Sequence, residues 1–597
     1  DALSAWFLLV VDFGGAMAAL FGLGYGRHDR EPMRVLPFFP VFLAAMNLVL
    51  LADDAFVFLL SWETMSLSSW LLVLANHRQP DNARAGLVYL VMAVFGTGCL
   101  LLAFGIMAGF EGAYGFDAIR SHPVSGWLGA IALVLVLLGA GTKAGLVPGH
   151  AWLPLAHPAA TSQVSALMSG VMTKVALYGL IRVLFDLAGD VSWVWGAVLL
   201  AVGAVSAVLG LLYALMQRDL KVLLAYSTVE NVGIIAIALG LALVFKANSL
   251  MPLAAIAFTA ALFHVLNHSL FKSLLFFGSG AILVATGERD MERLGGLIHR
   301  LPRTAVLCLI GAAAISALPP FNGFISEWLT FQAIINAPVL PQWTLKFGVP
   351  LVGAALALAA ALAAACFVRA YGITFLGRPR SAAAAEAKEV EAPMLVAMGI
   401  LAALSIALGL VPVLALLPLD TVCLLVLGVH FPSLASGAGA QQWLYLVPLS
   451  ATSSSYSGIF VLLVVTAVTL AVVEGVHRRA SARLRRGPAW DCGFPDLRPE
   501  TQYSASSFAQ PLRRVFGTLV FSAREQVEMP PPGDPRPARL TVSLIDPAWA
   551  AFYAPVGNGV GWLADRLNGL QYLTIRRYLT MVFVALILLL SIVVLKG

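Results

Sequence analysis

Charged residues and clustered metal ligands are both scarce in this chain. Only 11% of its 597 residues are Asp, Glu, Lys or Arg, whereas charged residues make up about 25% of soluble domains. The 5 cysteines show no CxxC spacing, so the sequence supports neither an iron–sulfur cluster nor a disulfide framework. The net charge of +6 is modest, and no stretch indicates nucleic-acid binding. We therefore expect this chain to bind no cofactor, metal ion or nucleic acid.

Hydrophobic residues, by contrast, make up 60% of the chain and form many long runs. A run of about 20 apolar residues crosses the hydrocarbon core of a bilayer, and unbroken runs of this length form helices there. The sequence therefore predicts an all-α, multi-pass membrane protein with about 14 spans. The predicted spans lie near residues 3–24, 35–52, 55–75, 86–108, 128–147, 162–186, 191–215, 222–243, 252–284, 302–335, 347–375, 392–418, 457–477 and 578–596.

Basic residues gather in every second loop between these spans. They are Arg27, Arg30, Arg34, Arg78, Arg84, Arg218, Lys221, Arg300, Arg303, Arg378, Arg380 and Arg478 to Arg486. By the positive-inside rule these loops are cytoplasmic, which places residue 1 on the outer side. The chain begins with Asp1 and shows no signal peptide, so we expect further residues before it.

Two of the predicted spans contain prolines that should interrupt a helix. Pro148 lies in GTKAGLVPGHAWLPLAHP, just after Lys143, and Pro319 and Pro320 lie in ALPPFNGFISEW, just before Glu327. Interrupted helices at corresponding places in two halves are typical of inverted-repeat transporters, whose ion sites lie at the breaks. The alternative is two kinks that only improve packing.

A polar region follows residue 477. Residues 478–544 are rich in Pro and Arg, with a predicted amphipathic helix near 508–525 and a flexible PPPGDPRP turn. Residues 546–576 are predicted to form a helix that continues into the last span. This region is either a surface helix that packs along neighbouring proteins or an ordinary linker.

Titratable side chains inside the predicted spans are the most informative residues. A charge at the bilayer centre costs about 2.5–3.5 kcal/mol on insertion scales, so it usually faces a bundle interior or a water-filled path. Their mixture of acids, amines and imidazoles indicates a route for protons or small cations. The residues are Glu63, Lys143, Lys174, Glu230, His264, His268, Lys272 and Glu327.

Glu63 lies mid-span in FLLSWETMSLSSW, and its expected partner is a lysine on another span, with Lys143 and Lys174 on successive spans. A nearby carboxylate favours the charged form of a buried lysine. A Glu–Lys pair whose distance changes would therefore bind and release a proton. The alternatives are a structural ion pair, and a Lys143 that snorkels because its helix ends early.

His264, His268 and Lys272 recur at every fourth position, which places them along one face of a helix. Three titratable groups at this spacing can pass a proton through intervening waters. A metal-binding histidine pair is one alternative, although no HExxH pattern or carboxylate pair accompanies it. A satisfied polar packing face is the other.

Three more charged residues are candidates for the path. Glu230 lies in AYSTVENVGI, and Glu327 follows the second break, where it is predicted to face an exit. Lys221 lies at the cytoplasmic start of a span, so it is either part of the path or a positive-inside anchor.

Several motifs resemble the proton-conducting antiporter-like subunits of respiratory complex I, multisubunit Na⁺/H⁺ antiporters and membrane-bound hydrogenases. They are GTKAGLVPGHAWLPLAHPAATSQVSALMSG, RDLKVLLAYSTVENVGI, HVLNHSLFKSLLFFGSGAI and ALPPFNGFISEW, within residues 35–375. The variants TVENVGI and LNHSLFKS, and the motifs WDCGF and QYSASSFAQPL, are most similar to hydrogenase-4 component B and the large membrane subunit of formate hydrogenlyase.

The resemblance implies two inverted five-helix repeats, at 35–190 and 191–375, with broken helices that hold Lys143 and Glu327. It also implies that Glu63 pairs with Lys143. An N-terminal span at 1–34 would follow two preceding helices, with further spans at 376–477, a lateral extension at 478–577 and an anchor span at 578–597. The positions expected to carry protons are Glu63, Lys143, Lys174, Lys221, Glu230, His264, His268, Lys272 and Glu327.

Three residues depart from the family pattern. Ser169 stands where some relatives carry histidine, Glu327 stands where others carry lysine, and Glu230 is absent from the complex I relatives. Lys174 would therefore serve the step of the missing histidine, and the charge of the exit group differs within the family.

The expected function is proton translocation by a non-redox membrane subunit of a redox-driven complex in a bacterial or archaeal inner membrane. Partner membrane subunits and a peripheral redox arm would carry the iron–sulfur clusters and nickel–iron centre. Electron transfer there would alter the Glu63–Lys143 coupling and drive a proton outward past Glu327. The rivals are a cation/proton antiporter subunit without a redox partner, and a non-conducting membrane scaffold.

Overall fold

The computed structural model describes residues 1–29, 31–109, 112–435, 445–448, 454–479, 498–543, 549–568 and 574–596. The all-α, multi-pass fold class is confirmed: in the described part, 12 helices are long and apolar enough to cross a membrane. Two shorter apolar helices, Pro302–Ile315 and Val413–Leu427, lie beside them.

The first half of the chain forms the following helices. They are α1 (Ala2–Tyr25), α2 (Phe38–Leu51), α3 (Ala55–Val73), α4 (Pro80–Ala108), α5 (Phe116–Ser121), α6 (Gly126–Ala144), α7 (Leu153–Ala159), α8 (Ser162–Leu167), α9 (Thr173–Ile181), α10 (Trp193–Met216), α11 (Leu220–Ala247) and α12 (Met251–Thr286). A π-helical turn, Met168–Met172, joins α8 to α9 in one continuous span.

The second half continues the bundle and adds a short sheet. Its helices are α13 (Pro302–Ile315), α14 (Asn322–Ile335), α15 (Trp343–Phe375), α16 (Ala382–Glu386), α17 (Ala392–Leu410), α18 (Val413–Leu427), α19 (Pro432–Ala435), α20 (Gly458–Arg479), α21 (Ala505–Phe516), α22 (Ala554–Asn568) and α23 (Ile575–Lys596). Strands β1 (Arg524–Glu528) and β2 (Arg539–Ser543) pair antiparallel, with Arg524 opposite Ser543.

The structure differs from the predicted elements in three places. The predicted span 392–418 is two helices, because Val411 leaves the helical conformation before Pro412, as a residue before proline tends to do. The predicted helix 508–525 ends at Phe521, and the PPPGDPRP turn connects β1 to β2. The predicted helix 546–576 is helical over 549–568, while 544–548 and 569–573 lie outside the described residues.

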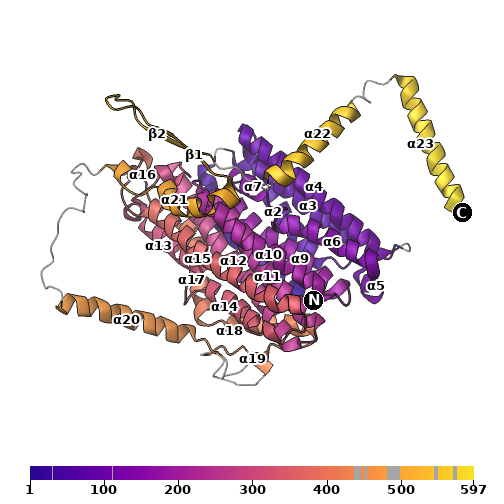
Figure 1. Ribbon diagram of the computed structural model, residues 1–597, viewed down its shortest axis with the longest axis horizontal. Helices are drawn as coiled ribbons and strands as arrows, with labels where there is room; N and C mark the ends of the chain where they lie inside the picture. The colour runs from indigo at the N-terminus through magenta and orange to yellow at the C-terminus, as the bar shows by residue number, and fades with distance from the viewer. Residues whose placement is uncertain are drawn as a thin grey trace. The chain divides into compact units, whose positions relative to one another are not determined.

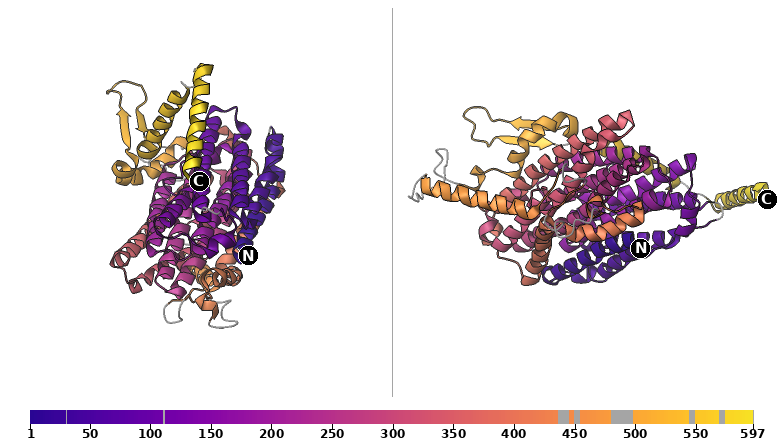
Figure 2. Two further views of the ribbon diagram at one scale, coloured as in Figure 1. Left: turned by 90° about the vertical axis from the view of Figure 1, so that its right-hand side faces the viewer. Right: turned by 90° about the horizontal axis from the view of Figure 1, so that it is seen from below.

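The chain divides into two compact units, Asp1–Ala509 and Gln510–Gly597. In the first unit, α10, α11 and α12 pack in sequence. Figure 1 shows α2, α3, α4 and α6 on the other side of α11 and α12 from α13, α15 and α17. In both views of Figure 2 the indigo N-terminal helices lie at one side of the bundle. The second unit contains the β-hairpin, α22 and α23.

Ion pairs in the first unit join loops that the charge pattern predicts on the same side of the membrane, either the outer or the cytoplasmic side. Arg182 pairs with Asp1 at 2.7 Å, at ends predicted to lie on the outer side. Arg27 pairs with Glu391 at 2.8 Å, in loops predicted to be cytoplasmic. The assignment of each set to a side of the membrane stays a prediction from the positive-inside rule.

The motif QYSASSFAQPL begins with a segment that binds two of the basic loops. The side chain of Gln502 accepts from the N–H of Arg378 and donates to its carbonyl, both at 2.9 Å. Ser506 donates its N–H and its hydroxyl to Glu292, at 2.9 and 2.7 Å. The motif WDCGF, at 490–494, lies outside the described residues.

Candidate functional site

Both predicted helix breaks lie beside a buried titratable residue. Lys143 lies in the last turn of helix α6, which is capped by Gly145. The φ of Gly145 is 95°, a left-handed conformation that favours glycine. Pro148 follows in a stretch without α-helix before α7 begins. Pro319 and Pro320 likewise lie between α13 and α14.

Lys143 is bound by hydroxyl groups. Its side chain is 3% exposed, and Nζ donates to Ser66 Oγ at 2.9 Å and to the Tyr89 hydroxyl at 2.7 Å. Nζ also lies 4.8 Å from the centroid of the Tyr89 ring, within the range of a cation–π interaction. Helices α3 and α4 thus supply the environment of this lysine.

The predicted Glu63–Lys143 ion pair is open in this structure. Glu63 is half-buried on α3 and accepts a hydrogen bond from Thr97 Oγ1 at 2.7 Å. Among the described residues, the ion pairs include none between Glu63 and Lys143. Each group has neutral partners instead, Thr97 for the carboxylate and Ser66 and Tyr89 for the ammonium.

Lys174 connects the two predicted repeats. It is 0% exposed on α9, and its Nζ lies in hydrogen-bond contact with Nδ1 of His268 on α12. The same ammonium donates to the Ser169 carbonyl at 2.7 Å and to Thr173 Oγ1 at 3.2 Å. The lysine and histidine predicted from separate motifs therefore meet across a helix interface.

His264 and Glu230 continue the line of buried polar side chains from Lys174 and His268 into the predicted second repeat. His264 Nδ1 lies 2.9 Å from Ser326 Oγ, and its Nε2 lies 3.2 Å from Asn231 Oδ1. The amide of Asn231 donates to the buried carboxylate of Glu230. Because Ser326 and Asn231 occupy both ring nitrogens of His264, the metal-pair alternative loses support.

Two further buried lysines lie at or against the first turns of α11: Lys221 is part of that helix, and Lys272 reaches it from α12. Lys272, on α12, donates to the Leu224 carbonyl at 2.8 Å and also to Ser227 Oγ. Lys221 is 1% exposed, and its Nζ donates to the Ala160 carbonyl just after α7, at 2.8 Å. A solvated anchor would be exposed, so the geometry favours a role inside the bundle for Lys221.

Glu327 lies on α14 beyond the second break. Its side chain is buried, and among the described residues it takes part in no hydrogen bond or ion pair. Ser326, the residue before Glu327, contacts His264. Glu327 therefore directly follows a residue that contacts the buried polar side chains described above. An exit role for Glu327 stays a prediction.

Sequence reasoning missed the neutral side chains that bind the charged residues. Ser66, Tyr89, Asn231 and Ser326 were all overlooked, as was His157, a fully buried histidine on α7. A usable signal exists, because polar residues within apolar spans need partners, and Ser66 lies three positions from Glu63. Which of these partners meets which charge depends on helix packing.

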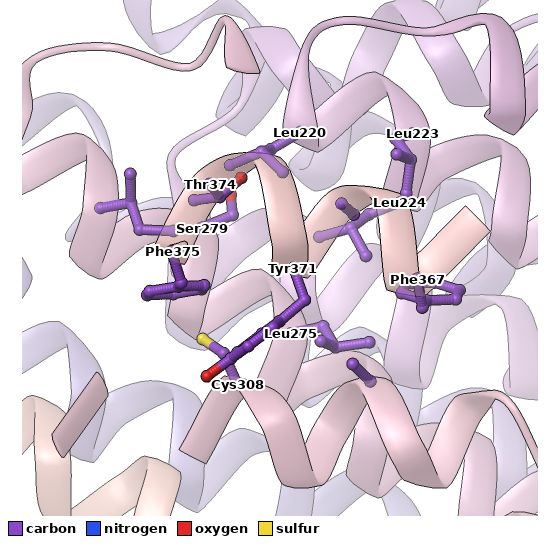
Figure 3. Close-up of a pocket in the computed structure, with 13 residues that line it drawn as sticks. Leu220, Leu223, Leu224, Leu275, Ser279, Cys308, Phe367, Tyr371, Thr374 and Phe375 are labelled. Carbon is purple, nitrogen blue, oxygen red and sulfur yellow. The ribbon is translucent and has the colours of Figure 1, made fainter. Parts of the chain in front are cut away.

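An apolar pocket (Figure 3) lies beside Leu224, the residue whose carbonyl accepts a hydrogen bond from Lys272. Residues of α11, α12, α13 and α15 line it, among them Leu224, Ser279, Cys308 and Thr374. The Ser279 and Thr374 hydroxyls are buried without a hydrogen-bond partner. In the part of the chain that the structure describes, no group of three His, Cys, Asp or Glu side chains is placed to hold a metal ion.

Known proteins share both the sequence and the fold of this chain. The family model described as NADH:quinone oxidoreductase/Mrp antiporter, transmembrane, matches residues 52–353. The chain is 38% identical to hydrogenase-4 component B of Escherichia coli (strain K12) over 604 aligned residues, which cover 99% of this chain and 88% of the relative. It is 30% identical to formate hydrogenlyase subunit 3 of the same organism over 523 residues, covering 87% and 80%.

A solved structure of an archaeal respiratory membrane complex, the membrane-bound sulfane sulfur reductase, contains a chain with the same fold. The TM-score is 0.77 at 23% sequence identity, and the match covers 99% of this chain and 89% of that one.

Proposed function

The chain belongs to the NADH:quinone oxidoreductase/Mrp antiporter family, and on that premise we propose that it translocates protons as an antiporter-like subunit of a respiratory complex. It is a multi-pass membrane protein, and its relatives named above are a hydrogenase-4 component and a formate hydrogenlyase subunit. The proposed path runs along Lys143, Lys174, the His264–Lys272 face and Glu230 to Glu327.

The observation that carries this proposal is the contact between Lys174 and His268. The two side chains come from α9 and α12, are each 0% exposed, and bring the first repeat into hydrogen-bond contact with the second. Burying a lysine against a histidine gains nothing for stability through charge pairing. A function that needs exchangeable protons explains both side chains.

The open state of the Glu63–Lys143 pair supports a switching role. Hydroxyl oxygens can bond an amine in either protonation state, whereas a carboxylate holds it charged. We propose that electron transfer in partner subunits moves the Glu63 carboxylate toward or away from Lys143. The lysine then binds or releases a proton, which passes along the proposed path toward Glu327.

The complex around this chain is also part of the proposal. Partner membrane subunits would be joined by a peripheral redox arm that carries iron–sulfur clusters and a nickel–iron centre, in a bacterial or archaeal inner membrane. The names of the hydrogenase-4 and formate hydrogenlyase relatives support this assignment.

The test is proton translocation by the whole complex in sealed everted vesicles, with hydrogen, formate or NADH supplied in turn. Lys143→Ala and Glu63→Gln should each slow proton translocation at least about tenfold, while native gels show an assembled complex. Lys346→Ala is the matched control, because Lys346 is exposed. Unchanged translocation in both variants would favour the scaffold.

Cation/proton antiport is the second candidate, because the family model covers Mrp antiporters as well as the quinone oxidoreductases. The same vesicles separate the two functions. An antiporter would exchange protons for Na⁺ or K⁺ when a salt gradient is imposed without any electron donor, whereas the proposed subunit would need electron transfer.

A further inference from the structure

One fully buried histidine has no partner for either ring nitrogen. His157 lies on α7 and is 0% exposed, and neither Nδ1 nor Nε2 makes a hydrogen bond. A buried polar group without a partner is costly, so most such groups bond to protein or to ordered water. Packing alone would favour an apolar ring here, and the imidazole therefore needs a functional explanation.

Two aromatic rings fix the orientation of this imidazole. The Trp152 and Phe276 rings contact it edge-on, with centroids 5.8 and 5.5 Å away. The indole N–H of Trp152 is already used, since it donates to the Thr142 carbonyl at 2.8 Å. The contacts therefore hold the ring in place and leave both of its nitrogens available.

Lysines on three other helices lie near enough for their charges to act on this ring. The charges that act on His157 are those of Lys174 on α9, Lys221 on α11 and Lys272 on α12. Lys221 reaches the Ala160 carbonyl, three residues beyond His157. Lys272 lies four residues, about one helical turn, before Phe276. His157 thus lies where the break of the first repeat meets the first turns of α11 and the middle of α12.

We propose that His157 passes protons, through bound water, between Lys221 and Lys272. Neutral imidazole accepts a proton at one nitrogen and donates one from the other, so each transfer changes the tautomer and leaves no net charge. A return of the tautomer or a flip of the ring resets it. A neutral relay suits this place, because a second lasting positive charge among three lysines would be unfavourable.

Further polar atoms near the ring are suited to bind water. Ser165 donates its hydroxyl to the His157 carbonyl at 2.7 Å, and the Thr161 hydroxyl is buried without a partner. Ser279, one turn beyond Phe276 on α12, is also unpartnered and lines the pocket of Figure 3. A buried water needs two to four polar partners, and this stretch supplies them from the pocket to the lysines.

The inference rests on the proposed function, and the same vesicle assay tests it with two variants. His157→Phe keeps an aromatic ring against Trp152 and Phe276 but has no nitrogen. His157→Gln can bond water but cannot relay a proton by changing tautomer. We expect both to lower the protons moved per electron at least about tenfold. His299→Phe, the same change at an exposed histidine, is the matched control.

Thermal stability separates relay from structural support. Since no protein atom among the described residues bonds either nitrogen of His157, His157→Phe breaks no hydrogen bond within that part of the protein, and the variant should unfold at the same temperature as the wild type or higher. A stable complex with lost translocation supports the relay. Wild-type translocation in either assembled variant overturns it, and His157→Gln decides if His157→Phe does not assemble. If the wild type itself moves no protons, the proposed function fails instead.

Discussion

At the residue scale, the buried lysines of this chain are bound by neutral oxygen and nitrogen atoms. Lys143 donates to two hydroxyls, Lys272 to a carbonyl and a hydroxyl, and Lys174 contacts His268. Such partners bond an amine in either protonation state. The arrangement therefore tolerates loss and gain of a proton, which a closed ion pair with a carboxylate would resist.

Lys174→Met tests whether a buried lysine of this chain serves proton transfer and not stability. Replacing a buried charge by an apolar side chain of similar length is often neutral or stabilising, so the thermal unfolding temperature should stay the same or rise. Proton translocation should fall at least about tenfold. The exposed Lys388→Met is the control. A destabilised complex that still moves protons would make Lys174 a structural residue.

At the scale of elements, α10 and α11 are held together by glycines that bring their backbones into contact. A Cβ at Gly203 would lie 2.8 Å from the Gly233 carbonyl oxygen and from the Ile237 nitrogen. A Cβ at Gly210 would lie 2.6 Å from the Glu230 nitrogen. Small residues allow such close packing between membrane helices, and here they set the position of Glu230.

Gly203→Val should force these two helices apart. Overpacking of a tight interface costs about 1–3 kcal/mol, so we expect a lower unfolding temperature of the purified protein in detergent, followed by fluorescence size-exclusion after heating. Gly105→Val is the matched control, because a Cβ at Gly105 meets nothing within 4 Å. Equal stability of the two variants would contradict the close contact.

At the scale of the whole molecule, ion pairs among the described residues join loops that are predicted to lie on the same side of the membrane. Arg120 pairs with Asp186 at 2.7 Å in the outer set, and Arg78 pairs with Glu31 at 3.2 Å in the cytoplasmic set. The basic set also contains Lys221 and the segment that begins with Gln502. The charge pattern therefore predicts that the Lys221 end of the path faces the cytoplasm.

Single cysteines test this orientation. Ser121→Cys, in a loop predicted to be outside, should react with a membrane-impermeant maleimide in intact cells. Gln79→Cys, in a loop predicted to be cytoplasmic, should react only after the membrane is opened. Both positions are exposed, and the protein without added cysteine gives the background. The reverse pattern of labelling would invert the path.

Much of the candidate site could be predicted from sequence, since charges in apolar runs are visible without a structure. The breaks at Pro148 and at Pro319–Pro320 were equally visible, because proline acts on its own helix. The β-hairpin of residues 524–543 was missed, because β1 has a single apolar residue and shows no alternation, although β2 alternates polar and apolar residues as a strand does. The division of 392–418 at Pro412 was overlooked although the signal was local.

The sequence by itself determined that this protein is a helical membrane protein with titratable groups inside its spans, because hydropathy and backbone satisfaction depend on local composition. Only the tertiary structure decided which groups meet. It put Lys143 against Ser66 and Tyr89, with Glu63 bound by Thr97 instead. A hydrogen-bond partner depends on which helices adjoin and how each is rotated, and helix packing sets both.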